Sequence, residues 1–553
     1  MMGTSLKIAV AFLVCVALVP AILFNANGGY GSPLQGNRNI DGYLKLTILS
    51  LHGVLVAMWL YSKFFDTAKP KPAEPLLIPL TVAVPSINSD PEVAPPVAPT
   101  PRPAGGGARD AYLDNIKSVL TALVVMHHIA CTMQPTPIFF TTHTVLCTRN
   151  ATAPLGPGLC IPTSFADNVF NKVFATWFLG INQDWFMTAF FFISAYFTPG
   201  SVDRKGARTF LIERAKRLSL PFLVFYFGIN AAVNAMNSQL DGIPPSSLWK
   251  STGPTLFFNE GPPWFISWLV LFGLLYVGVH SKKSALKMPP PTLAPLLLFG
   301  GLVGLLCTII APAGQDSLSN WWSMPGASMP GGCYMFIWYV IAWGGGVVAR
   351  RSAWLEAWVG KGETPPAIEP NQERFLVTSL MLILVVKFAY VYNCMFFPEF
   401  EFANPPGQPM PYAGAISIME HGFLPIIMFL VVLIFFKRQA NGGGGLWKFL
   451  SQAAYTVYLI HPFVVLLVHR FYMYIVSEAV RSSGGFVQYS GNTYIPGYGP
   501  LLPYGQFLVV VASRSQQELV TWFGFVFICV VANLIVWPLA WIIKWLPGCR
   551  DVL

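Results

Sequence analysis

Two adjacent histidines near the end of an apolar stretch are the residues in this sequence whose types most suggest chemistry. The stretch YLDNIKSVLTALVVMHHIACTM covers residues 112–133 and contains His127 and His128, with Lys117 near its start. Lys117 and His128 are eleven positions apart, so on a helix they share a face and lie about 16 Å apart along the axis. Ionisable groups are costly in a bilayer and mark functional sites by default. An imidazole can take a proton from a hydroxyl, which predicts His128 as a general base.

The alternative for this pair is structural, because a membrane histidine can simply hydrogen-bond between helices. His127 projects about 100° away from His128, so only one of the two shares the face of Lys117. We expect His127 to support or orient His128.

A second polar interruption lies in FLGINQDWFMTAFFFISAYF, residues 178–197, where Asn182, Gln183 and Asp184 break an apolar span. Asp184 could orient a histidine and stabilise its protonated form, as the acid of a hydrolase triad does. Alternatively, this carboxylate faces a water-filled cavity on the outer side or marks the end of the span. Both interpretations stay open at this point.

The segment DRKGARTFLIERAKRLSLPF, residues 203–222, carries six Lys or Arg residues beside two apolar spans. Such a cluster can signal membrane topology or attract anionic lipid. However, Arg214 and Arg217 are three positions apart and share a helical face, and the planar guanidinium suits phosphates. A cytosolic phosphate-bearing donor such as acyl-coenzyme A would fit there.

Three further residues are candidates. Trp264 in GPPWFISWL lies just inside a span, where an interfacial aromatic residue is the usual interpretation. His461 in YTVYLIHPF precedes Pro462, so it could satisfy the backbone carbonyl that the proline leaves without a donor. Lys387 lies in the middle of the span containing LVVKFAYVY and needs a partner or a water-filled cavity, which the sequence does not identify.

The elements that position these residues are predicted to be membrane helices. Of the 553 residues, 54% are hydrophobic and 10% are charged, whereas soluble domains carry about 25% charged residues. The fold class predicted is all-α, a polytopic membrane bundle of about 12 transmembrane helices. The formal net charge of +10 indicates basic cytoplasmic loops and not a nucleic-acid partner. The nine cysteines show no CxxC pair and no metal-ligand spacing, so we predict no metal and no permanently bound cofactor.

Twelve apolar segments support this count: residues 7–24, 44–62, 113–133, 174–198, 218–236, 263–280, 293–312, 333–349, 376–397, 415–436, 446–469 and 519–546. The positive-inside rule places residues 66–112 in the cytoplasm, because most Lys and Arg residues then fall inside. Residues 1–65 would form an N-terminal pair of spans and residues 110–546 a ten-span body. Between them, residues 66–109 are rich in Pro, Ala and Gly and are predicted to be disordered. The first segment is either an uncleaved anchor or a signal peptide, and its poor cleavage site favours the anchor.

One polar loop carries marks of an oxidising compartment. Cys147 and Cys160 share it with the sequon Asn150-Ala151-Thr152. A disulfide and a glycan would both require this loop to be lumenal or extracellular. The predicted topology places the loop on that side.

Taken in order, these motifs resemble the acyltransferase 3 family of integral membrane acyltransferases, including its glucan-biosynthesis protein C-like branch. YLDNIKSVLTALVVMHH is similar to the family's opening span, in which a basic residue and a histidine are separated by ten residues. Here these are Lys117 and His128, with lysine in place of the usual arginine. DWFMTAFFFISAYF resembles the next span, with Ala195 in place of glycine, and FLIERAKRLSLPF resembles the following Arg-x-x-Arg element. GPPWFISWL and YTVYLIHPF resemble two later elements, so the resemblance covers about residues 110–546.

The resemblance implies transfer of an acyl group, commonly acetyl or succinyl, from a cytosolic acyl-coenzyme A to a hydroxyl of a carbohydrate or lipid-linked acceptor. The donor is a co-substrate and not a bound cofactor. Lysine at position 117 keeps the positive charge of the usual arginine but loses bidentate phosphate recognition.

The sequence therefore favours a multi-pass O-acyltransferase of an endomembrane or the plasma membrane. The residues expected to carry the reaction are His128, His127 and Asp184 for proton transfer, and Lys117, Arg214 and Arg217 for the donor phosphates. Two alternatives remain: a proton-coupled transporter or flippase, for which no inverted repeat is seen, and a sensor that binds the acyl donor without catalysis.

Overall fold

The computed structural model describes residues 51–60, 111–133, 144–149, 160–161, 169–233, 235, 262–279, 287–310, 322–324, 327–329, 332–360, 366–396, 413–482, 486–490, 506–511, 514–550 and 552–553. Most of the predicted N-terminal pair of spans, the predicted linker and the sequon at Asn150 lie outside these residues. Predictions about those segments, and about the domain boundaries, therefore stay predictions.

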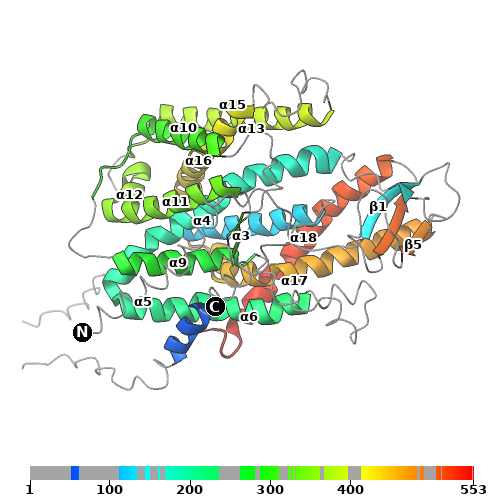
Figure 1. Ribbon diagram of the computed structural model, residues 1–553, viewed down its shortest axis with the longest axis horizontal. Coiled ribbons are helices and arrows are strands. Elements are labelled where there is room, and N and C mark those ends of the chain that lie inside the picture. Colours follow the sequence, from blue (N-terminus) through cyan, green and yellow to red (C-terminus); the bar gives the residue numbers. More distant parts are fainter. Residues whose placement is uncertain are drawn as a thin grey trace, which may run out of the picture.

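Helices make up most of the described structure and run roughly side by side along the long axis of the molecule (Figure 1). The first half of the body contains α3 (Ala111–Thr132), η2 (Phe170–Ala175), α4 (Thr176–Lys205), α5 (Ala207–Arg214), η3 (Ala215–Ser219), α6 (Leu220–Val224), η4 (Phe225–Ile229) and α9 (Trp264–Val279). The elements labelled η are single π-helical turns within longer helices.

The second half contains α10 (Leu293–Ile310), α11 (Gly332–Ser352), α12 (Trp354–Val359), α13 (Pro370–Phe396), α15 (Ala413–Ile418), η6 (Met419–Phe423), α16 (Leu424–Gln439), α17 (Gly445–Ser482) and α18 (Arg514–Trp545). Each of the ten apolar segments predicted for the body is helical where the structure describes it, except for single residues at three segment ends: Met133, Pro263 and Leu546. The helical bundle is therefore confirmed as the fold class.

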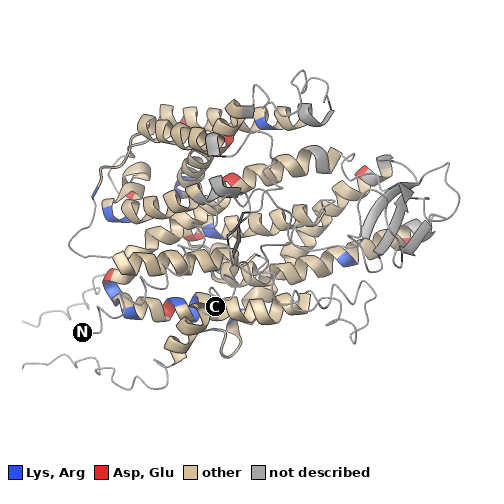
Figure 2. Cartoon of the chain, in the orientation of Figure 1, with Lys and Arg blue, Asp and Glu red and all other residues tan. Residues whose placement is uncertain are grey.

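The surface of several helices is apolar, as expected of a protein in lipid. On α13, Met381, Leu382 and Val385 are all more than half exposed, and so are Leu519 and Leu534 on α18. Figure 2 shows that charged residues are sparse along the helices. Exposed apolar faces of this extent mark contact with a membrane.

Four helical stretches in the described part of the chain are long and apolar enough to cross a membrane: Pro370–Tyr392, Gly414–Gln439, Gly445–Ala479 and Glu518–Trp545. The segments Leu51–Leu60, Trp264–Val279 and Leu293–Thr308 are apolar but shorter. The protein is an integral membrane protein, and the predicted number of about 12 spans stays a prediction.

Glycines bring two pairs of elements into close contact. A Cβ atom added to Gly304 of α10 would lie 2.8 Å from the main chain of Gly422 in η6, and one added to Gly300 would lie 2.8 Å from the Gly422 carbonyl oxygen. Likewise, a Cβ atom at Gly346 of α11 would overlap the carbonyl oxygen of Phe192 in α4. Small residues spaced by four are a common means of close helix packing in membranes. These contacts fix α10 against η6 and α11 against α4.

Short strands, which the sequence analysis did not predict, form two small sheets. In the larger sheet the order is β2 (Cys160–Ile161), β1 (Thr144–Arg149), β6 (Gln506–Val511) and β5 (Phe486–Ser490), with β1 parallel to β6 and the other pairs antiparallel. It lies at one end of the bundle (Figure 1). Strands β3 (Trp322–Met324) and β4 (Ala327–Met329) pair antiparallel.

The larger sheet bears on the predicted disulfide. Arg149 lies opposite Cys160 in the register, so Cys147 and Cys160 lie on neighbouring strands, two positions apart. Their side chains are not among those described, and the disulfide stays a prediction.

The segment Leu51–Leu60, which belongs to the predicted N-terminal pair, packs on the body. Its His52 ring stacks on Phe222, with ring centroids 4.2 Å apart, and His52 Nε2 lies 3.3 Å from the hydroxyl of Ser267 in α9. Leu51 and Leu55 join an apolar cluster with residues of α4, α5 and α9.

Candidate active site

The structure pairs His128 of α3 with His461 of α17. His128 Nδ1 lies 2.7 Å from His461 Nε2, and the two ring planes are nearly parallel, at 6°, with their centroids 4.9 Å apart. Both histidines are buried, with 6% and 0% of the residue exposed, respectively. The two predicted motifs that contain these histidines are 333 residues apart in the chain, and the fold brings them into direct contact.

Pro462 determines which ring nitrogen of His461 carries the hydrogen in the neutral form. Proline has no N–H, so the carbonyl of Tyr458, four residues earlier, receives no helical hydrogen bond from position 462. His461 Nδ1 lies 2.8 Å from that carbonyl oxygen. A carbonyl can only accept, so Nδ1 of His461 carries the hydrogen and its Nε2 is an acceptor in the neutral ring.

The tautomer of His128 follows from that of His461. Its Nδ1–H donates to His461 Nε2, so His128 Nε2 carries the lone pair. The sequence analysis proposed that His461 satisfies the carbonyl released by Pro462. The structure shows this contact, and it also orients the predicted base.

His127 takes a different position. Its ring lies edge-on to His128, with centroids 5.7 Å apart, and contacts Phe186 of α4 at 5.2 Å. Within the described part of the chain, His127 Nδ1 is buried without a hydrogen-bond partner, whereas His128 Nδ1 contacts His461. His127 is therefore positioned as a packing neighbour of His128.

Helix α17 brings three predicted motifs together. The hydroxyl of Tyr458 donates to the carbonyl of Pro262, in the GPPWF motif that begins α9. Tyr455, one turn earlier, lies close enough to Arg214 for an electrostatic interaction. Tyr455, Tyr458 and His461 follow each other at intervals of three, covering about 9 Å of helix axis. One side of α17 therefore leads from the basic segment to the histidine pair.

Trp264 is buried at the start of α9. It packs against Tyr339 of α11 and Phe191 of α4, with ring centroids 5.7 Å and 6.4 Å away. With 3% exposed, it lies in the interior and not in an interfacial belt.

Two of the predicted donor-binding cations, Lys117 of α3 and Arg214 of α5, contact two consecutive residues of α4. The Lys117 ammonium is 5.2 Å from the centre of the Phe197 ring and 2.7 Å from Asp114. The Arg214 guanidinium donates to the hydroxyl of Thr198 over 3.1 Å. Burial lowers the pKa of Arg214 to about 10, so it remains charged at neutral pH. These two cations therefore flank one turn of α4.

The remaining cations at this end differ in exposure. Arg217 is exposed and lies near enough to Lys544 of α18 for the two positive charges to repel each other. Arg350 of α11 donates to the hydroxyl of Tyr196 over 3.3 Å, and its guanidinium lies 5.2 Å from that ring. Sequence reasoning counted Arg350 only as a topology signal, because its proximity to α4 depends on the packing of α11.

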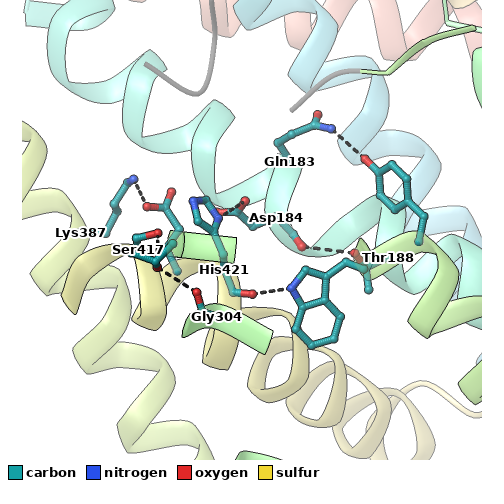
Figure 3. Close-up of polar contacts among 11 residues, drawn as sticks. Gln183, Asp184, Thr188, Gly304, Lys387, Ser417 and His421 are labelled. Carbon is teal, nitrogen blue, oxygen red and sulfur yellow. Dashed lines mark hydrogen bonds and ion pairs between the residues drawn. The ribbon is translucent and has the colours of Figure 1, made fainter. Parts of the chain in front are cut away.

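Asp184 does not contact the histidine pair. Its Oδ1 lies 3.1 Å from Nδ1 of His421, which donates to it, in the π-helical turn η6 (Figure 3). The expected partner was His128, and the structure brings Asp184 to a different histidine. With 2% exposed, Asp184 does not face an open outer cavity.

The structure supplies the partner that Lys387 lacked. Its ammonium forms an ion pair with Glu420, the residue before His421 (Figure 3). Gly180 of α4 leaves room for this pair, since a Cβ atom there would lie 3.3 Å from a Glu420 carboxylate oxygen. Asp184, His421, Glu420 and Lys387 together form what we call the charged network.

Glu420 and His421 were missed at the level of sequence, although the signal was present. Both lie in the apolar segment 415–436, and the rule that singled out Lys387 applies equally to them. No group of three or more His, Cys, Asp or Glu side chains among the described residues is arranged to hold a metal ion.

Comparison with known families decides the classification. The family model of the acyltransferase domain of the acyltransferase 3 group matches residues 110–541. The chain belongs to the acyltransferase 3 family. It is thus a membrane acyltransferase that transfers groups other than aminoacyl groups. Searches of the curated proteins and of the solved structures return no match. The assignment of the protein to the glucan-biosynthesis protein C-like branch of this family stays a prediction.

Proposed function

We propose that the protein is an O-acyltransferase that moves an acetyl or similar acyl group from a cytosolic acyl-coenzyme A to a hydroxyl of a carbohydrate or lipid-linked acceptor. The observation that carries this proposal is the His128–His461–Tyr458 chain of hydrogen bonds. It presents an imidazole whose Nε2 can accept a proton, which is what hydroxyl activation requires.

In this mechanism the acceptor oxygen attacks the carbonyl carbon of the thioester while His128 Nε2 takes the hydroxyl proton. The C–O bond forms, the C–S bond breaks, and His128 returns the proton to the leaving sulfur as coenzyme A departs. His461 is a positioning residue: it holds His128 in the required tautomer and stabilises the imidazolium through the same hydrogen bond.

The cations near the end of α4 support a site for the donor phosphates. Lys117 and Arg214 lie beside Phe197 and Thr198, and the thioester arm would follow α3 for about 16 Å to reach His128. Arg350, through its contact with Tyr196, is a third candidate at this end. Lysine and arginine suit a donor that carries several phosphates.

The carrier alternative rested partly on buried charges, including Lys387. The ion pair with Glu420 gives this lysine a structural partner, so its burial alone does not favour transport.

The test is a transfer assay in lipid nanodiscs. Purified protein receives acetyl-coenzyme A labelled on the acetyl group, with a membrane and glycan extract as acceptor. Wild type should move label into a base-labile product, and His128→Ala should reduce kcat roughly 100- to 10,000-fold. His469→Ala is a matched control, because His469 is also buried on α17 but lies eight residues beyond His461.

Full activity of a folded His128→Ala variant would exclude the assigned base. Binding of coenzyme A without any transfer by wild type would favour the sensor. Absence of both binding and transfer would favour the carrier.

A further inference from the structure

A cavity lies on a different face of α4 from the side that contacts the histidine His127. It has a volume of about 390 Å³ and is lined by residues of α4, α10, α11, α12 and α16 and of the segment before α10. Thr188 of α4 lines it, whereas Phe186, two residues earlier, contacts His127. Two residues correspond to about 200° around a helix, so the cavity and the proposed base are separate sites.

The cavity offers no side-chain donor to a polar ligand. Among its lining side chains only Thr188 and three tryptophans carry N–H or O–H groups, and each donates to a main-chain carbonyl. Trp354 donates to Met288 over 2.9 Å, Trp358 to Pro291 over 3.1 Å, Trp338 to His421, and Thr188 to Asp184 over 3.3 Å. The remaining lining residues are Ala, Gly, Pro, Phe, Leu, Ile and Met.

Water is a poor occupant of such a space, because a buried water needs two to four polar partners. A volume of about 390 Å³ is within the ~300–1,000 Å³ range of small-molecule sites. An occupant must therefore be apolar, and it must be available inside the membrane.

The cavity opens where lipid is expected. Two lining residues, Met288 and Phe299, are 45% and 43% exposed, whereas the deep lining residues Trp338 and Leu430 are almost completely buried. Phe299 is next to Leu298 on α10, which is 66% exposed. The opening is thus continuous with an apolar outer face.

We propose that this cavity binds one acyl chain of a phospholipid from the surrounding bilayer. The chain enters beside Met288 and Phe299 and ends near Trp338. The acyl chain moves from the hydrocarbon core of the bilayer to an equally apolar cavity, so the hydrophobic effect does not drive its binding. The stabilisation comes from the dispersion contacts that the lining atoms lack around an empty space.

The deep end of the cavity also touches the charged network. Trp338 lines the cavity and donates to the carbonyl of His421, and Thr188 donates to the carbonyl of Asp184 (Figure 3). A bound chain would hold both side chains in place. Binding of the chain would therefore stabilise η6 and the turn of α4 that contains Asp184 and Thr188.

The experiment uses the full chain in nanodiscs that contain a trace of phosphatidylcholine with a diazirine at the end of one acyl chain. After irradiation, labelled positions are mapped by mass spectrometry. Label should concentrate on deep cavity residues such as Trp338 and Leu430, relative to the lipid-facing residues Leu382 and Val385 of α13.

Two variants test the space itself. Ala342→Phe fills the cavity from α11 and should reduce labelling there roughly tenfold, because a close-packed interior leaves a chain no room. Val385→Phe, on the exposed face of α13, is the matched control and should leave the cavity labelling unchanged. If Ala342→Phe fails to give a monodisperse protein, Ala189→Leu fills the same space from α4.

Equal labelling of the cavity and of α13 in wild type would overturn the proposal. If neither filling variant folds, this ratio of cavity labelling to α13 labelling is the test of the proposal. Undiminished cavity labelling in a folded filling variant would overturn it as well. The transfer assay is independent, since the cavity does not adjoin His128.

Discussion

The histidine pair (His128 and His461) and the charged network are both buried between helices, yet they handle charge in different ways. In the pair, two rings that are neutral in this arrangement share one hydrogen bond, and a backbone carbonyl sets the tautomers. In the network, each basic group contacts a carboxylate: Lys387 pairs with Glu420 and His421 with Asp184.

This difference distinguishes a site that can accept a proton from a site that holds helices together. A neutral imidazole with a defined tautomer keeps a lone pair for a proton. A lysine paired with a carboxylate has its charge compensated, which makes burial tolerable but leaves no basic lone pair. The network connects α4, α13 and η6, and we interpret it as the polar link that holds these elements together.

The largest effect should come from breaking the ion pair of the network. Lys387→Met leaves Glu420 buried without its cation, and the free energy of unfolding should fall by about 3–5 kcal/mol. Thermal unfolding in detergent, followed by light scattering, measures this. Adding Glu420→Leu should recover most of the loss, because an apolar pair of similar volume is tolerated. A stable Lys387→Met single variant would show that the ion pair does not hold the helices.

The next effect concerns the positioning of His128. His461→Phe keeps a ring of similar size but removes the acceptor for His128 Nδ1, so kcat should fall about 100-fold while KM for the donor stays the same. Steady-state kinetics in nanodiscs test this, with His469→Phe as the control on the same helix. An unchanged kcat in a folded His461→Phe variant would mean that His128 needs no orienting partner.

Pro462→Ala should separate stability from activity. The new N–H at position 462 can donate to the carbonyl of Tyr458 and compete with His461 Nδ1. A net hydrogen bond contributes about 1 kcal/mol, so the required tautomer should be depleted and kcat should fall about fivefold. The melting temperature should rise at the same time. If kcat and the melting temperature both fell, or both rose, the proposed link between Pro462 and the tautomer of His128 would be wrong.

The smallest effect should come from Asp184→Asn. The amide still reaches His421, and interhelical hydrogen bonds in membranes contribute about 1 kcal/mol, so the protein should be slightly less stable. We expect kcat to match that of wild type, because Asp184 contacts His421 and not His128. A kcat as low as that of His461→Phe would place the network in the proton transfer.

The helical segments and the importance of His128 could be predicted because they depend on local signals. An apolar run of about 20 residues predicts a span. A histidine within such a run indicates a functional site, because burying an ionisable group in the bilayer costs free energy. The role of His461 was partly accessible as well, since a proline at position i+1 leaves the carbonyl at i−3 without a donor.

The partners could not be predicted, because they depend on how helices far apart in sequence pack. Asp184 contacts His421, 237 residues away, and no pattern in the chain distinguishes His421 from His128 as its partner. The short strands were missed for a similar reason. β1 pairs with β6, more than 350 residues further along the chain, and each strand is too short to show a clear alternation.

The length of α17 has a consequence for the depth of the reaction in the bilayer. Its 38 residues measure about 57 Å, whereas a hydrocarbon core of about 30 Å needs only about 39 Å of helix even at the ~40° upper limit of tilt. At least about 18 Å of α17 therefore extends beyond the core. Tyr474 is 64% exposed and suits the headgroup layer, where Trp and Tyr are enriched, about 20 Å beyond His461. Anchored in this way, the histidine pair would keep a constant distance from one leaflet surface. In thicker membranes, hydrophobic mismatch would then change only the distance from the other surface.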